Sequence, residues 1–124
     1  MELLPTKYGI YDYALAYYGI YDYALAYIDT IEKIKEHTGY SFSPDKSKII
    51  YDVNNLIAKC INNNLHIGRS PRSIAAACVY IVLALNGYRL KQEEISIVSG
   101  VNTVTIRKRY REIIETFEID AFIS

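Results

Sequence analysis

An uncharged run of thirteen residues constrains the fold of this chain more than any other feature. Residues 73–85 read SIAAACVYIVLAL and contain no charged side chain. Ser70 and Pro71 precede the run, and this pair is typical of an N-cap followed by the first helical position. Asn86-Gly87 follows the run and favours a stop. Thirteen residues are too few to cross a bilayer, so the sequence predicts a helix that is buried on nearly all sides.

Two helices are predicted before this run. The first begins near Tyr18 and ends at His37-Thr38-Gly39, where the glycine suits a left-handed stop. Its apolar stripe consists of Ala24, Ile28, Ile31 and Ile34. The second opens at Ser43-Pro44, which repeats the cap-plus-proline signal. Its apolar stripe consists of Ile49, Val53, Leu56, Ile57, Cys60 and Ile61.

Two further helices are predicted after the run. Residues 91–99 form a short one with Ile95 and Val98 inward, closed by Gly100. The last is capped by Asn102 or Thr103 and extends to about residue 117. Its inward positions are Ile106, Tyr110, Ile113 and Ile114. No segment alternates like a strand, so we expect one all-α domain of five helices.

An identical tandem repeat opens the chain. The decapeptide YGIYDYALAY occupies residues 8–17 and again 18–27, and it holds eight of the 13 tyrosines. Ten residues at roughly 100° each rotate the second copy about 80° from the first, so the copies cannot share one helical face. The first copy is either an extension of the helix or a separate segment. We therefore divide the chain into a leader (1–18) and a domain (19–124). The repeat is either a recent duplication without a role or a tyrosine-rich contact surface for a partner or a second subunit.

Cysteine count and hydropathy exclude several classes of protein. Cys60 and Cys78 are the only cysteines and form no C-x-x-C pair, so a zinc ribbon is excluded. Both lie among apolar residues, which favours buried, reduced thiols over a disulfide. No membrane span and no secretion signal are present, so we expect a cytoplasmic, nucleoid-associated protein.

No catalytic constellation is evident. Neither His37 nor His66 has a cysteine or carboxylate at a spacing typical of a metal site or a nucleophile, and we interpret both as solvated loop histidines. Glu93 and Glu94 are adjacent, which is more typical of first-turn acids than of an acid–base pair. Phosphate-loop and dinucleotide motifs are missing. We predict neither an enzyme nor a cofactor.

Charge is segregated although the net charge is zero. Residues 1–36 carry six acids and three bases, and residues 112–124 carry four acids and no base. Residues 59–111 carry nine Lys or Arg against two Glu, a net of +7. Such a segment is typical of a face that binds a polyanion, and an ordinary solvated helical surface is the alternative.

The segment 91–111, KQEEISIVSGVNTVTIRKRYR, has the pattern of a helix-turn-helix. In such a motif the start of the second helix enters the major groove, where Arg107 can bind guanine O6 and N7. Val104 and the Thr105 methyl group suit a thymine methyl group, and Thr103 suits phosphate. Arg111 shares a face with Arg107. An amphipathic surface helix without a DNA role is the alternative.

Two motifs resemble the second cyclin-type repeat of archaeal transcription factor B and eukaryotic transcription factor IIB. GRSPRSIAAACVYIVLAL is similar to the third helix of that repeat, and VNTVTIRKRYREI is similar to its recognition helix. The resemblance implies a cyclin-like fold that binds the B recognition element upstream of the TATA box. It places Val104, Thr105 and Arg107 on the bases. The candidates for the DNA backbone are Arg69, Ser70, Arg72, Lys91, Thr103, Lys108 and Arg111.

The chain departs from that family in length. It has no ribbon cysteines and room for one repeat only, so it is either an excised domain or a stand-alone factor, and Met1 with the unusual leader favours the latter. We expect double-stranded promoter DNA as the partner, with TATA-binding protein as a further candidate. The alternative function is a cyclin-fold protein adaptor that uses the Tyr8–Tyr27 repeat for a partner or for self-association.

Overall fold

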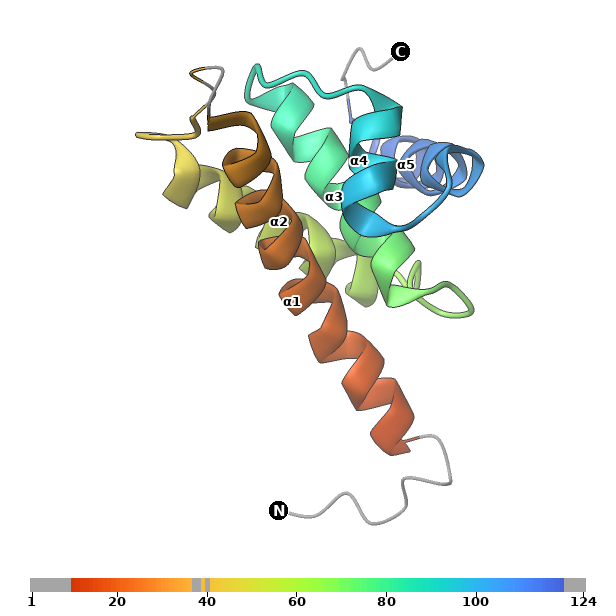
Figure 1. Ribbon diagram of the computed structural model, residues 1–124. Helices are drawn as coiled ribbons and strands as arrows, with labels where there is room; N and C mark the ends of the chain where they lie inside the picture. The colour runs from red at the N-terminus through yellow and green to blue at the C-terminus, as the bar shows by residue number, and fades with distance from the viewer. Residues whose placement is uncertain (1–9, 37–38, 40, 120–124) are drawn as a thin grey trace.

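Five helices make up the computed structural model, which describes residues 10–36, 39 and 41–119, with the backbone alone at 10–18. In chain order they are α1 (Ile10–Lys35), α2 (Lys46–Asn62), α3 (Pro71–Leu85), α4 (Gln92–Ser99) and α5 (Thr103–Phe117) (Figure 1). No strand occurs in these residues. The prediction of an all-α, five-helix fold is confirmed.

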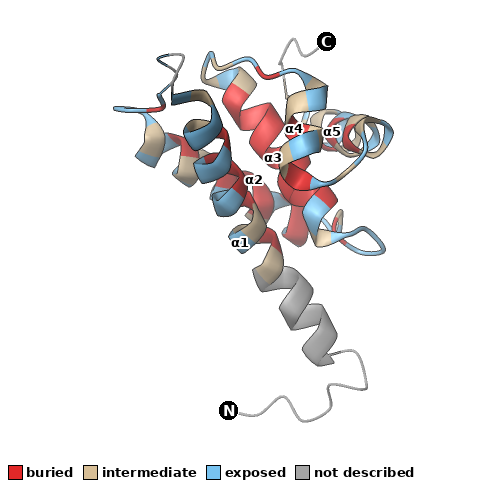
Figure 2. Ribbon diagram, viewed as in Figure 1, coloured by how far each residue is buried: buried red, intermediate tan, exposed pale blue. Residues whose placement is uncertain are grey.

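Helix α3 forms the centre of the fold. The Ser70 side chain accepts a hydrogen bond from the Ser73 amide, and Pro71 occupies the first turn, as the sequence predicted. Every residue from Ser73 to Leu83 is buried, and Figure 2 shows α3 almost entirely in the buried colour. All four other helices pack against it. Because residues 73–83 have no face in contact with water, the absence of charge in this part of α3 is a condition of the fold.

Helix α2 packs as predicted but begins later than predicted. All six residues of its expected stripe, from Ile49 to Ile61, are buried. The expected start at Ser43-Pro44 is wrong, because the first helical hydrogen bond runs from the Ile49 amide to the Asp45 carbonyl at 2.9 Å. The Ser43 amide instead donates to Ser41 Oγ at 3.1 Å, so Ser43 belongs to the preceding turn.

Helix α1 buries a stripe that differs at its C-terminal end from the predicted one. Ala24, Ile28 and Ile31 are buried, but Ile34 is 52% exposed. Ile34 borders a shallow apolar groove of about 200 Å³ beside α4, where Ile97 is also exposed. The last turn of α1 lies beside α4, where Lys35 Nζ pairs with Glu94 Oε2 at 2.8 Å, but Ile34 lines the open groove between the two helices.

The tandem repeat lies largely within α1. The helix begins at Ile10, inside the first copy, so the boundary we predicted between residues 18 and 19 falls within a continuous helix. The first-copy tyrosines lie outside the residues whose side chains are described. In the second copy Tyr27 is buried, and Tyr21 and Tyr23 pack partly against the core. These three tyrosines therefore support the fold of this chain.

Cys60 and Cys78 meet between α2 and α3. Their sulfur atoms are 3.9 Å apart, and both thiols are free and buried, as the sequence predicted. The neighbouring Cys60 and the burial of the site raise the pKa of the Cys78 thiol well above its usual value. The Cys78 thiol therefore remains protonated, and both side chains pack as small apolar groups.

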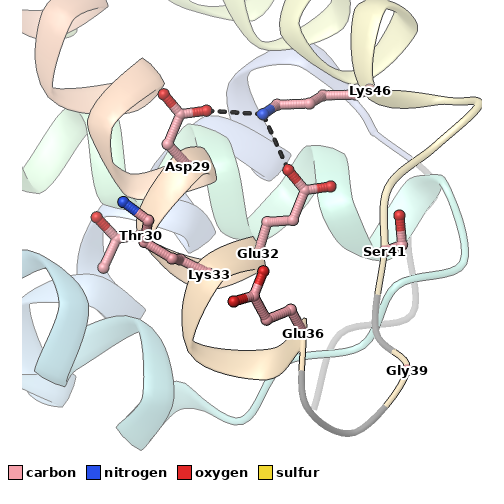
Figure 3. Close-up of a pocket in the computed structure, with 8 residues that line it drawn as sticks. All are labelled: Asp29, Thr30, Glu32, Lys33, Glu36, Gly39, Ser41 and Lys46. Carbon is pink, nitrogen blue, oxygen red and sulfur yellow. Dashed lines mark hydrogen bonds and ion pairs between the residues drawn. The ribbon is translucent and has the colours of Figure 1, made fainter.

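A lysine joins the start of α2 to α1. Lys46 Nζ lies 2.9 Å from Asp29 Oδ1 and 2.9 Å from Glu32 Oε1, at the edge of an open acidic pocket (Figure 3). The second oxygen of Glu32 accepts a hydrogen bond from the Phe42 amide at 3.0 Å. The hydrogen bond from Lys46, followed by that from Phe42, lowers the pKa of Glu32.

Replacing Glu32 tests this link through its pH dependence. A carboxylate with a lowered folded-state pKa stabilises the protein above its unfolded-state pKa of 4.5 and loses that contribution as the pH falls below it. We expect Glu32→Gln to cost about 1 kcal/mol or less at pH 7, because solvent screens the pair. In urea unfolding the difference from wild type should shrink as the pH falls below 4.5 and vanish once Glu32 is protonated in the folded protein. Glu36→Gln, at an exposed carboxylate of the same pocket, is the control. A constant difference across the pH range would contradict the assignment.

Candidate nucleic-acid interface

Local capping interactions build a helix-turn-helix from α4 and α5. The Lys91 amide donates to Glu94 Oε1 at 2.8 Å and so stabilises the start of α4. Gly100 ends α4 in the left-handed region, with φ of 74°. Asn102 Oδ1 then accepts a hydrogen bond from the Thr105 amide at 2.9 Å and begins α5. The sequence predicted each of these boundaries to within one residue.

Helix α5 has one buried side and one cationic side. Ile106, Tyr110 and Ile113 are buried against α3 and α4. Lys108 and Arg111 are exposed on the other side. The helix therefore presents positive charge to solvent while its apolar side fixes its orientation.

The three predicted base-reading residues lie at the start of α5 with different exposures. Val104 is 53% exposed. Thr105 is partly buried. Arg107 is also partly buried, and its Nη1 donates to Gln92 Oε1 at 2.8 Å. Arg107 thus extends across the first turn of α4 and does not project freely into solvent as the sequence suggested.

The first turn of α3 brings Arg72 to the turn between α4 and α5. The Arg72 guanidinium lies 5.1 Å from the centre of the Tyr23 ring. The guanidinium donates a hydrogen bond to the Tyr23 side chain, and this bond raises the pKa of Arg72. A methyl group placed on Gly100 would lie 3.8 Å from Arg72 Nη1, so the guanidinium borders the turn directly. Ser70, beside it, is engaged as the N-cap of α3.

Arg69, another predicted backbone contact, is already paired within the protein. Its Nε lies 3.2 Å from Glu112 Oε1, and its Nη2 contacts Glu112 Oε2. Arg109 Nη1 also reaches Glu112 Oε1, at 3.2 Å. These contacts attach the loop to α5. The remaining candidates for contacts with the DNA backbone differ in solvent exposure. Lys91 and Lys108 are exposed, whereas Thr103 is partly buried.

A family model described as the transcription factor TFIIB repeat matches residues 42–116. The chain belongs to this family. The match spans α2 to α5, and it confirms the cyclin-like, all-α fold expected from the two sequence motifs.

Relatives of this TFIIB repeat are much longer proteins. Transcription initiation factor IIB of Methanococcus aeolicus is 43% identical over 65 residues, which are 52% of this chain and 20% of that protein. The protein of the same name from Sulfurisphaera tokodaii is 35% identical over 91 residues, which are 73% of this chain and 28% of that protein. The chain thus spans less than a third of the length of these relatives.

Two side chains of the TFIIB repeat touch the candidate interface without having been predicted. Gln92 contacts Arg107 from fifteen residues away, and Tyr23 supports Arg72 from α1. Neither contact has a signal in local sequence, because each joins side chains of two different helices. Tyr23 could have been suspected only from its place on the inward side of α1.

Other kinds of site are not found in the described part of this TFIIB repeat. Within residues 10–36, 39 and 41–119, no three His, Cys, Asp or Glu side chains lie close enough to hold a metal ion. No described helix has the length and apolar character needed to cross a membrane. The prediction that His66 is a solvated histidine is wrong, because it is only 6% exposed, and burial lowers its pKa. His37 lies outside the described residues.

Glycine substitutions test the geometry of the turn. Gly100→Ala should destabilise the repeat by roughly 1–2 kcal/mol, because its φ of 74° is unfavourable for a side chain although space is available. Gly19→Ala is the matched control, since Gly19 lies inside α1 and its nearest neighbour would be 3.6 Å away. It should stabilise by about 0.5–1 kcal/mol in urea unfolding. Equal effects of the two changes would contradict the turn geometry.

Proposed function

We propose that this TFIIB repeat binds double-stranded promoter DNA as a transcription initiation or regulatory factor, with the start of α5 in the major groove. The observation that carries the proposal is the solvent-facing side of α5, where exposed Val104, Lys108 and Arg111 lie beside Arg107. An exposed apolar side chain among cations matches the needs of base-edge contacts flanked by phosphates. Membership of the family supports this assignment, and the relatives are named as transcription initiation factors.

Base recognition is assigned to three side chains. The Val104 methyl groups and the Thr105 methyl group suit the C5-methyl group of thymine. Arg107 suits guanine, because its planar head can donate two parallel hydrogen bonds to O6 and N7. The resemblance to the second repeat of factor B makes the B recognition element the first sequence to test.

Phosphate contacts are assigned to the cations and helix starts around α5. Arg111 and Lys108 continue the exposed side of α5, and Arg72 borders the turn that precedes it. The further candidates are Ser70, Lys91, Thr103 and Arg69. Arg69 has to share its guanidinium with Glu112. The domain of residues 19–124 is the proposed DNA-binding unit, nucleoid-associated through this contact, and TATA-binding protein is a proposed further partner.

A second candidate function is that of a protein adaptor. The observation that favours it is the apolar groove between α1 and α4, where Ile97 is 79% exposed and Ile34 is 52% exposed. Exposed apolar patches of this kind are typical of protein contact sites. Undetectable binding to DNA at low salt would favour the adaptor over the DNA-binding function.

Two arginine substitutions test the division into base and backbone contacts. Arg107→Ala should cost roughly 1–3 kcal/mol on the preferred duplex and relax the base preference. Arg111→Ala should weaken binding to all duplexes alike. It should also reduce the slope of log affinity against log salt concentration by about 1, which corresponds to the loss of one phosphate contact. Fluorescence anisotropy with a labelled duplex across a salt series measures both effects.

Lys33→Ala provides the control for these substitutions, because it removes an exposed cation from α1 next to the acidic pocket. It should leave the affinity for DNA unchanged. Equal losses on matched and scrambled duplexes for Arg107→Ala would refute its role in base recognition. A loss for Lys33→Ala as large as that for Arg111→Ala would show that binding follows net charge and not the α5 face.

A further inference from the structure

We infer that Gln92 is a positioning residue that holds Arg107 ready for a guanine edge. The inference rests on the proposed DNA-binding function and deepens it. Gln92 is the first residue of α4, whereas Arg107 lies in the first half of α5. Their hydrogen bond therefore joins the two helices of the motif at the residue assigned to base recognition.

Both ends of the Gln92 carboxamide are engaged. Its Oε1 accepts from Arg107 Nη1 at 2.8 Å, and its Nε2 donates to the Tyr110 hydroxyl at 3.1 Å. A further hydrogen bond joins Gln92 to Tyr80. A reversed carboxamide would turn its NH₂ group toward the guanidinium, which can only donate. The donor-only guanidinium therefore requires the carboxamide oxygen, and the tyrosine hydroxyls, which can accept, hold the NH₂ group on the opposite side.

The tyrosines that orient Gln92 are parts of the core. Tyr80 of α3 and Tyr110 of α5 are 5% and 4% exposed, and their ring centres are 5.3 Å apart. Gln92 is itself partly buried. The contact with Arg107 is thus supported by packed side chains, which is the arrangement expected of a preorganised binding residue.

The hydrogen bond leaves Arg107 able to bind DNA. A guanidinium has five N–H donors, and Gln92 uses one of them. Two parallel donors are sufficient for guanine O6 and N7. Arginine otherwise loses rotamer freedom on binding, and a side chain that is already held in the free protein loses less.

Gln92→Ala tests the inference through base discrimination. The probe is the duplex preferred by the wild-type chain after selection from a randomised library, together with its single-base-pair variants. The measured ratio is the affinity for the preferred duplex divided by the affinity for the variant duplex that differs at the Arg107-dependent base pair. We expect Gln92→Ala to lower this ratio about two- to tenfold. Affinity for the variant duplexes should change little. In the Arg107→Ala background the Gln92→Ala substitution should have no further effect on the ratio, because Gln92 acts through Arg107.

Two further variants separate positioning from folding. Tyr110→Phe keeps the buried ring and removes only the hydroxyl that accepts from Gln92, so it should lower the ratio by less than Gln92→Ala does. Glu93→Gln, at the exposed neighbour on α4, should leave the ratio unchanged. Thermal unfolding followed by circular dichroism identifies any variant that fails to fold, and Tyr110→Phe then provides the test in place of Gln92→Ala.

The outcomes distinguish this inference from the function on which it rests. If Arg107→Ala abolishes discrimination but Gln92→Ala and Tyr110→Phe do not change it, the positioning role is refuted and the DNA-binding function stands. If Gln92→Ala lowers the ratio equally in the presence and absence of Arg107, Gln92 contacts a base directly and the inference is also wrong. If the wild-type chain binds no duplex, both proposals fail.

Discussion

Burial of α3 is the constraint on which the rest of this structure depends. A helix with eleven consecutive uncharged and buried residues has to be enclosed, and four amphipathic helices enclose it. Each of them turns its apolar side inward, so its polar residues are left on the outside. For α5 this places Ile106, Tyr110 and Ile113 inside and leaves the opposite, cationic side free for a ligand. The orientation of the candidate recognition helix is thus a consequence of core packing.

The same packing separates the charges that cancel in the composition. Lys46, Asp29 and Glu32 join α1 to α2 at an acidic pocket, whereas the cations of the candidate interface belong to α5, to the start of α3 and to the segments before α3 and α4. Figure 1 shows α2 and α5 on different sides of α3. A net charge of zero therefore coexists with a positive face, which is what binding to a polyanion requires. Glu112 reduces the positive charge of that face, because its carboxylate pairs with Arg69 and Arg109.

Sequence reasoning succeeded where the signals are local. The caps at Ser70 and Asn102, the glycine at 100 and the stripe of α2 were all predicted, because each depends on residues within one or two turns. The exposure of Ile34 and the burial of His66 were not predicted, because both depend on which distant residues pack beside them. The same holds for the candidate site. The basic helix α5 could be identified from its residues, but the hydrogen bond from Arg107 to Gln92 and the ring of Tyr23 below Arg72 join separate helices.

The central claim is that one face of the repeat, formed by the start of α5 and the loop before α3, meets DNA. Amide chemical shifts of the ¹⁵N-labelled chain, titrated with the selected duplex, test it most directly. The account predicts the largest changes at residues 102–111 and at Ser70 to Arg72, with little change at Asp29, Glu32 and Lys46. Changes concentrated around those three residues, or spread evenly over the surface, would contradict it.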